Sequence, residues 1–299
     1  MRLRALAPGK VNLCLWLGGR RADGRHELVT LLQSVSLADE LELVTLPERR
    51  DDEVHCPGVQ GPNIVSRALA GLRARGWDAP PVRVTIDKRV PVAGGMGGGS
   101  ADAAATLRLA RELSPVPDDL ISELAAELGA DVPSQLAPGL VLGTGAGDVV
   151  EAVPALAPFG LLILPAPRAL STAEVYREAD RLGLARDAAP LGSRCVELRS
   201  ALRPGKQLAP GLIVNDLQPA AVSLCPEIVR ALDAAGAAGA ELAFVCGSGA
   251  TVAALYWGSV GPERAGAAAR ALEPRFPGAS SAAPVSHEIA TFGHNQCRQ

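Results

Sequence analysis

The sequence predicts an α+β protein built from two domains. Segments with apolar residues at every second position, which is typical of strands, alternate with segments that carry them at three- and four-residue spacing, as helices do. The chain has 299 residues, enough for one large or two medium domains. A proline-containing stretch at 154–158 marks a point where the sequence pattern changes, which is typical of a domain boundary. We therefore predict domains at 1–155 and 156–299.

The first expected strand covers residues 10–17 and ends at Gly18 and Gly19. The odd-numbered positions from 11 to 17 are apolar and lie on one face of a regular strand. Lys10 and Asn12 fall on the other face, so they point the same way. The alternation predicts a strand that is buried on one face only.

The segments that follow alternate between strand and helix patterns. Residues 28–32 and 34–37 favour strand or short helical structure, 40–44 favours a strand, and the polar stretch 47–61 favours a surface loop. Apolar spacing predicts an amphipathic helix from Asn63 to Arg75 and a strand at 82–87. A helix from Ser100 to about Leu113 is expected next, with Ser100 as N-cap and Asp102 in the first turn.

A second helix is expected at about 117–128, and Gly129 ends it. Asp131 then stands in a turn before Pro133, and a strand pair is expected within 139–150. In the second half we expect strands at 161–164, 242–246, 251–257 and 285–292, and helices at 172–182, after Asn215-Asp216-Leu217, at 226–235 and at 262–272. That order is compatible with a small α/β sandwich.

A glycine-rich loop joins the strand at 82–87 to the helix that follows it. Its residues are Pro91, Val92, Ala93, Gly94, Gly95, Met96, Gly97, Gly98, Gly99, Ser100 and Ala101. A glycine loop that ends at a helix N-terminus presents free N–H groups and a positive dipole end, which suits phosphate. The loop lacks both the Lys-Ser/Thr pair of the P-loop and the dinucleotide-binding spacing. From the loop alone, a flexible turn remains an equal alternative.

Composition excludes several classes of function. The net charge of −3 gives no electrostatic case for binding nucleic acid or an anionic membrane, and no apolar stretch is long enough to span a bilayer. Polar residues interrupt the N-terminal segment, so we expect no secretion signal. The six cysteines are scattered without metal-ligand spacing, which indicates thiols in a reducing cytoplasm and no metal site.

Three ordered motifs together resemble the GHMP small-molecule kinases. They are 7–13 (Ala-Pro-Gly-Lys-Val-Asn-Leu), the glycine loop at 91–104, and 246–252 (Cys-Gly-Ser-Gly-Ala-Thr-Val). The resemblance implies ATP as phosphoryl donor, Mg²⁺, and an active site in the cleft between two domains. It also implies a ribosomal-protein-S5-like N-terminal domain and a ferredoxin-like C-terminal domain.

Within that superfamily the sequence is most similar to the diphosphocytidyl-methylerythritol kinases. The similarity is carried by 10–12, 19–28, 129–133, 143–145 and 215–217. It implies phosphorylation of the 2-hydroxyl of a cytidine diphosphate-linked polyol in the non-mevalonate route to isoprenoid precursors. It further implies a small-molecule substrate as partner and leaves the oligomeric state open.

The resemblance also implies roles for individual residues. Asp131 matches the base that takes the hydroxyl proton, and Lys10 matches its cationic neighbour. Asn12 and His26 match positions at the hydroxyl and cytosine ends of the substrate. The remaining matches are Thr172 and Tyr176 on the substrate side, and Asn63 near the adenine, where a helix cap is the alternative.

Departures from the family pattern leave the acceptor alcohol open. Arg25 stands where the family has a tyrosine that stacks on cytosine, although a guanidinium can also stack on a base. Ser134 replaces an aromatic residue, and 145–147 lacks an arginine. A kinase for another small alcohol, or a silent binding protein with the same fold, are the alternatives. The presence of both Lys10 and Asp131 argues against the silent protein.

Overall fold

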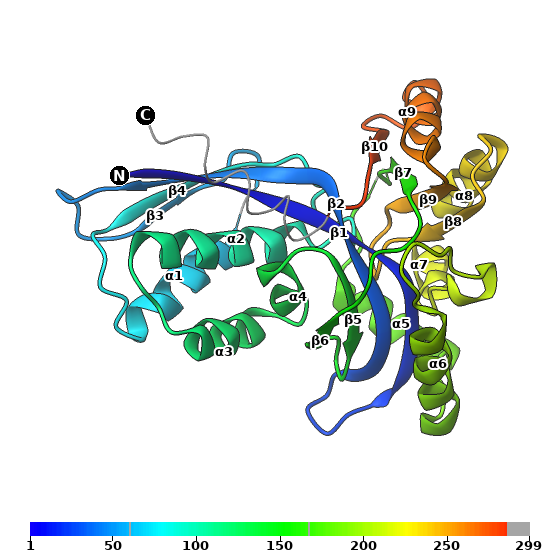
Figure 1. The fold of residues 1–299 in the computed structure, drawn as a ribbon, viewed down its shortest axis with the longest axis horizontal. Helices are drawn as coiled ribbons and strands as arrows, with labels where there is room; N and C mark the ends of the chain where they lie inside the picture. The colour runs from blue at the N-terminus through cyan, green and yellow to red at the C-terminus, as the bar shows by residue number, and fades with distance from the viewer. Residues whose placement is uncertain (60, 167, 286–299) are drawn as a thin grey trace.

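The computed structural model describes residues 1–59, 61–166 and 168–285, and it contains two β-sheets. Strands β1 (Arg2–Arg20) and β2 (His26–Thr45) form a long antiparallel ribbon that runs from one half of the molecule into the other (Figure 1). The other edge of β2 pairs with β4 (Val82–Asp87) near its end and with β5 (Leu140–Thr144) near its start. Strands β3 (Glu53–His55) and β6 (Val149–Ala152) complete this first sheet.

Helices cover one face of the first sheet. They are α1 (Ile64–Ala74), α2 (Gly98–Leu113), α3 (Asp118–Leu128) and the short α4 (Val132–Leu136). Figure 1 shows them together below the plane of β1 to β4. Helix α2 packs on β1 and β2, and α3 packs on the other helices of this layer. The start of α2 lies beside β1.

The second sheet has the strand order β10-β7-β9-β8 and is antiparallel throughout. Its strands are β7 (Phe159–Leu164), β8 (Leu242–Val245), β9 (Val252–Trp257) and β10 (Ser280–Ala282). The helices of this half are α5 (Thr172–Leu182), α6 (Ala188–Ala201), α7 (Gln218–Leu224), α8 (Glu227–Ala237) and α9 (Gly261–Leu272), with a 3₁₀ turn at Pro210–Leu212. The mixed two-sheet architecture confirms the predicted fold class.

Strand β1 corrects the expectation of a strand buried on one face. A bulge lies between Asn12 and Cys14, which pair with the consecutive residues Leu32 and Leu31. The extra residue reverses the alternation, so Leu15 continues the face of Lys10 and Asn12. Both faces of the strand are buried here, because the ribbon enters the second half of the molecule.

Other boundaries differ from the sequence prediction. The segments 28–37 and 40–44 form the single strand β2, and β3 lies inside the predicted loop. Helix α6 was not predicted. The last described strand is β10, while most of the strand expected at 285–292 lies outside the described residues.

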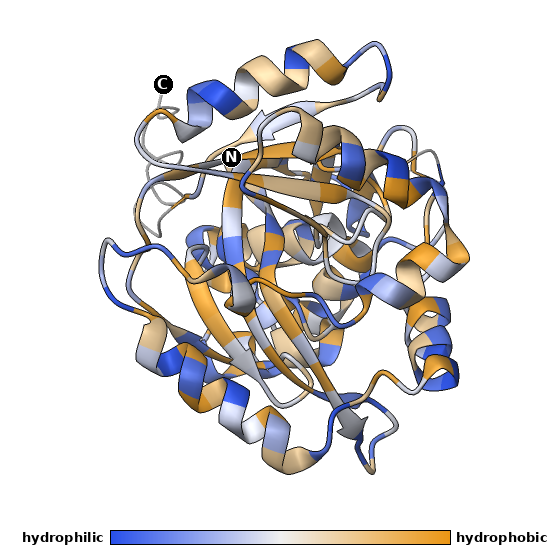
Figure 2. Ribbon diagram, turned by 90° about the vertical axis from the view of Figure 1, so that its right-hand side faces the viewer, coloured by the Kyte–Doolittle hydropathy of each residue, from blue (hydrophilic) through white to orange (hydrophobic). Residues whose placement is uncertain are grey.

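A continuous apolar core joins the two sheets. Trp16 and Leu31 of the ribbon belong to the same buried cluster as Phe159, Leu161 and Leu255 of the second sheet. Figure 2 shows the strands through the centre mainly in apolar colours, whereas the helices alternate between apolar and polar stretches. The chain passes from the first sheet to the second between β6 and β7, within the predicted boundary region. The division at 155 and 156 stays a prediction.

Candidate active site

A cavity of about 560 Å³ lies where the glycine loop, strand β1 and the second half of the molecule meet. Of the residues selected from the sequence, it is lined by Lys10, Asn12, Asn63, the loop from Pro91 to Ser100, Asp131, Thr172 and Tyr176. Three selected residues do not line it: Ala101 is buried inside α2, and Arg25 and His26 lie beyond its wall. The structure therefore brings most of the predicted site together.

The glycine loop ends two residues earlier than expected. Gly97 is the N-cap of α2 with a φ of 67°, and α2 begins at Gly98. Ser100 is thus in the first turn and is not the cap, and Asp102 lies beyond that turn. Glycine takes the left-handed conformation without strain, so the tertiary position of the loop overrides the local capping preference of serine. The first-turn N–H groups have no acceptor within the helix and lie at the cavity.

The glycine loop packs directly on the C-terminal glycine motif. A Cβ atom added to Gly95 would lie 1.9 Å from the carbonyl oxygen of Cys246, and one added to Gly249 would lie 2.1 Å from the carbonyl carbon of Gly94. The two backbones touch with no room for a side chain. Asn215 fixes the second motif, because its Nδ2 donates to the carbonyls of Val245 and Gly247 at 2.8 and 2.7 Å.

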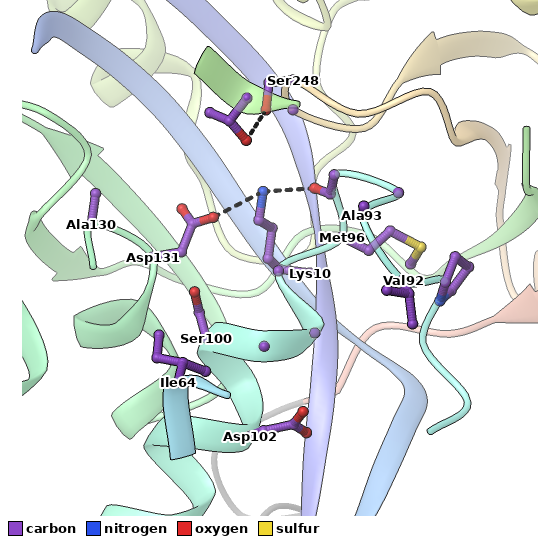
Figure 3. Close-up of a pocket in the computed structure, with 18 of the residues that line it drawn as sticks. Lys10, Ile64, Val92, Ala93, Met96, Ser100, Asp102, Ala130, Asp131 and Ser248 are labelled. Carbon is purple, nitrogen blue, oxygen red and sulfur yellow. Dashed lines mark hydrogen bonds and ion pairs between the residues drawn. The ribbon is translucent and has the colours of Figure 1, made fainter. Parts of the chain in front are cut away.

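Lys10 connects strand β1, the glycine loop and Asp131. Its Nζ donates to Asn12 Oδ1 at 2.8 Å and to the carbonyl oxygen of Gly95 at 2.9 Å, and it lies 3.4 Å from Asp131 Oδ2. Figure 3 shows the ammonium between the carboxylate and the loop. Asn12 in turn donates to Thr30 Oγ1 at 2.8 Å. The side chain of Lys10 is only 5% exposed, so this chain of hydrogen bonds holds it in one place. The expected proximity of Lys10 and Asp131 is confirmed.

Asp131 occupies the residue before α4 and directs its carboxylate away from that helix. It makes no capping hydrogen bond, whereas Ser134 Oγ donates back to the Asp131 carbonyl at 2.8 Å. The preceding helix α3 ends at Leu128, and the short helix α4 that begins after Asp131 was not predicted; Pro133 is tolerated in its first turn. The Asp131 side chain is 37% exposed, which leaves it accessible from the cavity.

Helix α5 contributes Thr172 and Tyr176 to the wall of the cavity. Ser248 Oγ donates to Thr172 Oγ1 at 2.9 Å, which links the C-terminal glycine motif to the start of α5. The ring of Tyr176 contacts the ring of His26, with centroids 5.2 Å apart. His26 is buried, and its Nε2 pairs with Asp180 Oδ1 at 2.7 Å. Burial and the charge of Asp131 raise the pKa of the Tyr176 phenol, which therefore stays neutral.

Arg25 is engaged by carboxylates and does not line the cavity. Its Nε donates to Asp23 Oδ2 at 3.0 Å, and its Nη1 donates to Asp148 Oδ2 at 2.8 Å. The pair with Asp148 joins the turn between β1 and β2 to the turn between β5 and β6. These pairs lie in the plane of the guanidinium and leave its faces free, so they do not by themselves exclude the stacking role that the resemblance left open.

Asn63 is the cap of α1 and also lines the cavity, while its place near the adenine stays a prediction. Its Oδ1 accepts a hydrogen bond from the N–H of Val65 at 2.8 Å, so it caps α1. The same residue lines the end of the cavity beside Ile64 and Cys56.

A buried charge cluster beneath the loop was missed by the sequence prediction. Lys88 Nζ pairs with Asp39 and lies 2.8 Å from Asp102 Oδ2, and both Lys88 and Asp102 line the cavity. Burial raises the pKa of Asp102 to about 7, although Lys88 opposes the shift. Asp39 and Lys88 are far apart in the sequence, so no local pattern indicates their pairing. The one available signal was the position of Lys88 just before the glycine loop in the sequence.

We predict that Asp102→Asn stabilises the protein as the pH rises. The pKa of Asp102 is above its unfolded value of 3.8, so its contribution to stability is present below pH 3.8 and is lost as the pH rises to about 7. The amide keeps an acceptor for Lys88 and does not ionise. The melting temperature of the variant should exceed that of the wild type by about 3 °C at pH 7.5, with the gap shrinking toward pH 4.5. The exposed Asp87→Asn serves as control, and a gap independent of pH contradicts the prediction.

Fold and site together define a class of protein: a two-domain kinase that transfers phosphate from a nucleotide to a small molecule. The N-terminal domain model of the GHMP kinases matches residues 63–139, and their C-terminal model matches 198–275. The chain belongs to the GHMP kinase family.

Similar proteins of several bacteria carry one name. The chain is 44% identical over 258 residues to the 4-diphosphocytidyl-2-C-methyl-D-erythritol kinase of Nocardia farcinica, with 83% of each chain covered. It is 39% identical over 273 residues to the kinase of that name from Corynebacterium efficiens, with 85% of each covered.

Solved structures agree with these sequence relatives. A crystal structure of a 4-(cytidine 5'-diphospho)-2C-methyl-D-erythritol kinase superposes with a TM-score of 0.72 at 31% identity, covering 95% of this chain and 99% of that chain. The crystal structure of L. major mevalonate kinase in complex with R-mevalonate has a TM-score of 0.70 at 18% identity, covering 95% of this chain and 96% of that chain. At that identity the second likeness shows the fold alone.

Proposed function

We propose that the chain is an ATP-dependent kinase that phosphorylates the 2-hydroxyl of 4-diphosphocytidyl-2-C-methyl-D-erythritol. The observation that carries the proposal is the Lys10–Asp131 pair, which faces the free N–H groups of the glycine loop across one cavity. The names of the relatives support the choice of substrate. A cytoplasmic location, as expected from the thiols, is part of the proposal.

The arrangement of the residues favours direct transfer of the γ-phosphoryl group from ATP to the substrate hydroxyl. Asp131 accepts the proton of the substrate hydroxyl as its oxygen attacks the γ-phosphorus, and the bond from that phosphorus to the β–γ bridging oxygen breaks to release ADP. Lys10 lies beside the carboxylate and the loop, where it offsets the negative charge of the transferring group. The first-turn N–H groups of α2 hold the phosphates of the donor.

Mg²⁺ fits the donor groups at this cavity as a companion of ATP. Magnesium in kinases is commonly held by one or two carboxylates or hydroxyls, substrate phosphates and water. The Ser100 hydroxyl lines the cavity and would supply such a donor beside the phosphates and water, which leaves Asp131 to the substrate hydroxyl. Among the described residues there is no cluster of three or more His, Cys, Asp or Glu side chains that would hold a metal without ATP. The bound ion supplies charge neutralisation at the phosphates.

The cytidine end of the substrate would lie against α5 and the start of β2. Tyr176 offers an aromatic ring at the cavity wall, and His26 supports that ring from behind while Asp180 holds the imidazole. Asn12 and Thr172 offer polar groups on the path from this end to Asp131.

None of the helices in the part of the chain that the structure describes is long and apolar enough to cross a membrane.

The test is ADP release by the purified protein with ATP, Mg²⁺ and one of three alcohols. The cytidyl substrate, mevalonate and homoserine are compared at equal concentrations. We expect turnover with the cytidyl substrate at least about 100 times faster than with the others, since buried polar groups discriminate strongly against ligands that leave them unpaired. Faster turnover with another alcohol would favour the alternative that Arg25 raised, and no ADP release with any alcohol would contradict the proposal.

A further inference from the structure

Arg108 lies within α2, and its guanidinium joins the strand that carries Lys10 to the short helix that directly follows Asp131. Its Nη1 donates to the carbonyl oxygen of Gln135 at 2.6 Å, and its Nη2 donates to the carbonyl oxygen of Leu6 at 2.8 Å. Leu6 precedes Lys10 on β1, and Gln135 follows Asp131 on α4. One planar guanidinium therefore bridges β1, which carries Lys10, and α4, which directly follows Asp131.

The chemistry of this bridge is specific to arginine. The guanidinium presents its N–H donors in a fixed fork, so two carbonyls that bind it are held at a fixed separation. A lysine ammonium is a point charge on a flexible stem and sets no such geometry. Burial lowers the pKa of Arg108 to about 10, so the group remains protonated at neutral pH.

Helix α4 depends on such an external support. It has only five residues, too few to form a stable helix alone, so its position is set by what it packs against. Helix α2 packs against both α4 and β1. Arg108 gives that packing a directional hydrogen bond on each side, to the strand that carries Lys10 and to the helix that follows Asp131.

We propose that Arg108 is a positioning residue for phosphoryl transfer, which fixes α4 against β1 and so sets the separation between Lys10 and Asp131. This rests on the proposed function, because Arg108 acts through Asp131. Arg108 does not line the cavity, so it acts on the alignment of the reacting groups and not on binding. Small misplacements of a catalytic group slow the chemical step far more than they weaken binding.

The first experiment separates kcat from KM in Arg108→Met and Arg108→Lys. Methionine keeps much of the length without any donor, and lysine keeps the charge without the fork. We expect kcat to fall about 10- to 100-fold in Arg108→Met and by a smaller factor in Arg108→Lys, with KM for ATP and for the cytidyl substrate within about twofold of the wild type. Ile121→Val, which removes a buried methyl group from α3, is the control for a general loss of stability and should keep its kcat.

A double-mutant cycle tests whether the effect passes through Asp131. Adding Arg108→Met to Asp131→Asn should change the residual kcat by less than about twofold, because the carboxylate to be aligned is gone. Multiplication of the two separate effects, or an unchanged kcat in Arg108→Met, would overturn the inference. If Arg108→Met does not fold, Arg108→Lys takes its place in the same cycle. Absence of turnover in the wild type is a different result, and it would overturn the proposed function.

Discussion

Replacing Asp131 with asparagine should lower kcat for the cytidyl substrate about 1,000-fold while the KM for ATP stays within about threefold. The amide fits the same space but takes no proton from the attacking hydroxyl. It also removes the charge that faces Lys10 Nζ at 3.4 Å. The ATP phosphates are expected on the loop N–H groups, which the substitution leaves in place. Steady-state kinetics with each substrate varied in turn measure both quantities.

The control for Asp131 is Asp233→Asn, which makes the same chemical change at an exposed position on α8. Its kcat should match that of the wild type. A kcat within about tenfold of the wild type in Asp131→Asn would exclude this carboxylate as the proton acceptor.

Substituting alanine for Gly95 should destabilise the fold and weaken ATP binding together. Gly95 has a φ of 82°, a conformation that costs an alanine about 1–2 kcal/mol. The added Cβ would also lie 1.9 Å from the carbonyl oxygen of Cys246 and 2.5 Å from the nitrogen of Gly249, so the two glycine motifs must separate. We expect the melting temperature to fall by about 5 °C or more and the KM for ATP to rise at least about tenfold.

Gly236→Ala is the matched control for this substitution. Gly236 lies in α8, and a Cβ there meets nothing within 4 Å. Alanine favours helix over glycine by up to about 1 kcal/mol, so this variant should melt at the same or a higher temperature. If Gly95→Ala behaves like Gly236→Ala, the contact between the two glycine motifs does not form as described.

Local patterns predicted the elements whose burial is one-sided. Strand β4 and helix α5 have the predicted bounds, because each shows one apolar face to the core and one polar face to solvent. The pattern failed at β1, where one extra residue between Asn12 and Cys14 reverses the faces and no sequence signal marks it. It also failed at Ser100, because the contacts of Gly97 decide where α2 begins.

The site residues that lie within sequence motifs could be predicted. Lys10, Asp131 and the glycine loop lie in recognisable motifs, and the structure brings them to one cavity. Lys88 with Asp39, and Arg108 with the carbonyls of Leu6 and Gln135, are pairings between distant parts of the chain. Such pairings depend on the tertiary fold and leave no local pattern to read.

The most direct test of the proposed reaction is the ³¹P NMR spectrum of the product formed from ATP and 4-diphosphocytidyl-2-C-methyl-D-erythritol. We predict one new phosphomonoester signal whose intensity equals one phosphate per ADP formed. It should lack coupling to a proton on the phosphate-bearing carbon, because carbon 2 carries a methyl group and no hydrogen. That signal should be absent over the same time with Asp131→Asn. ADP accompanied only by inorganic phosphate, or a phosphate on another hydroxyl, would contradict the assignment of this cavity.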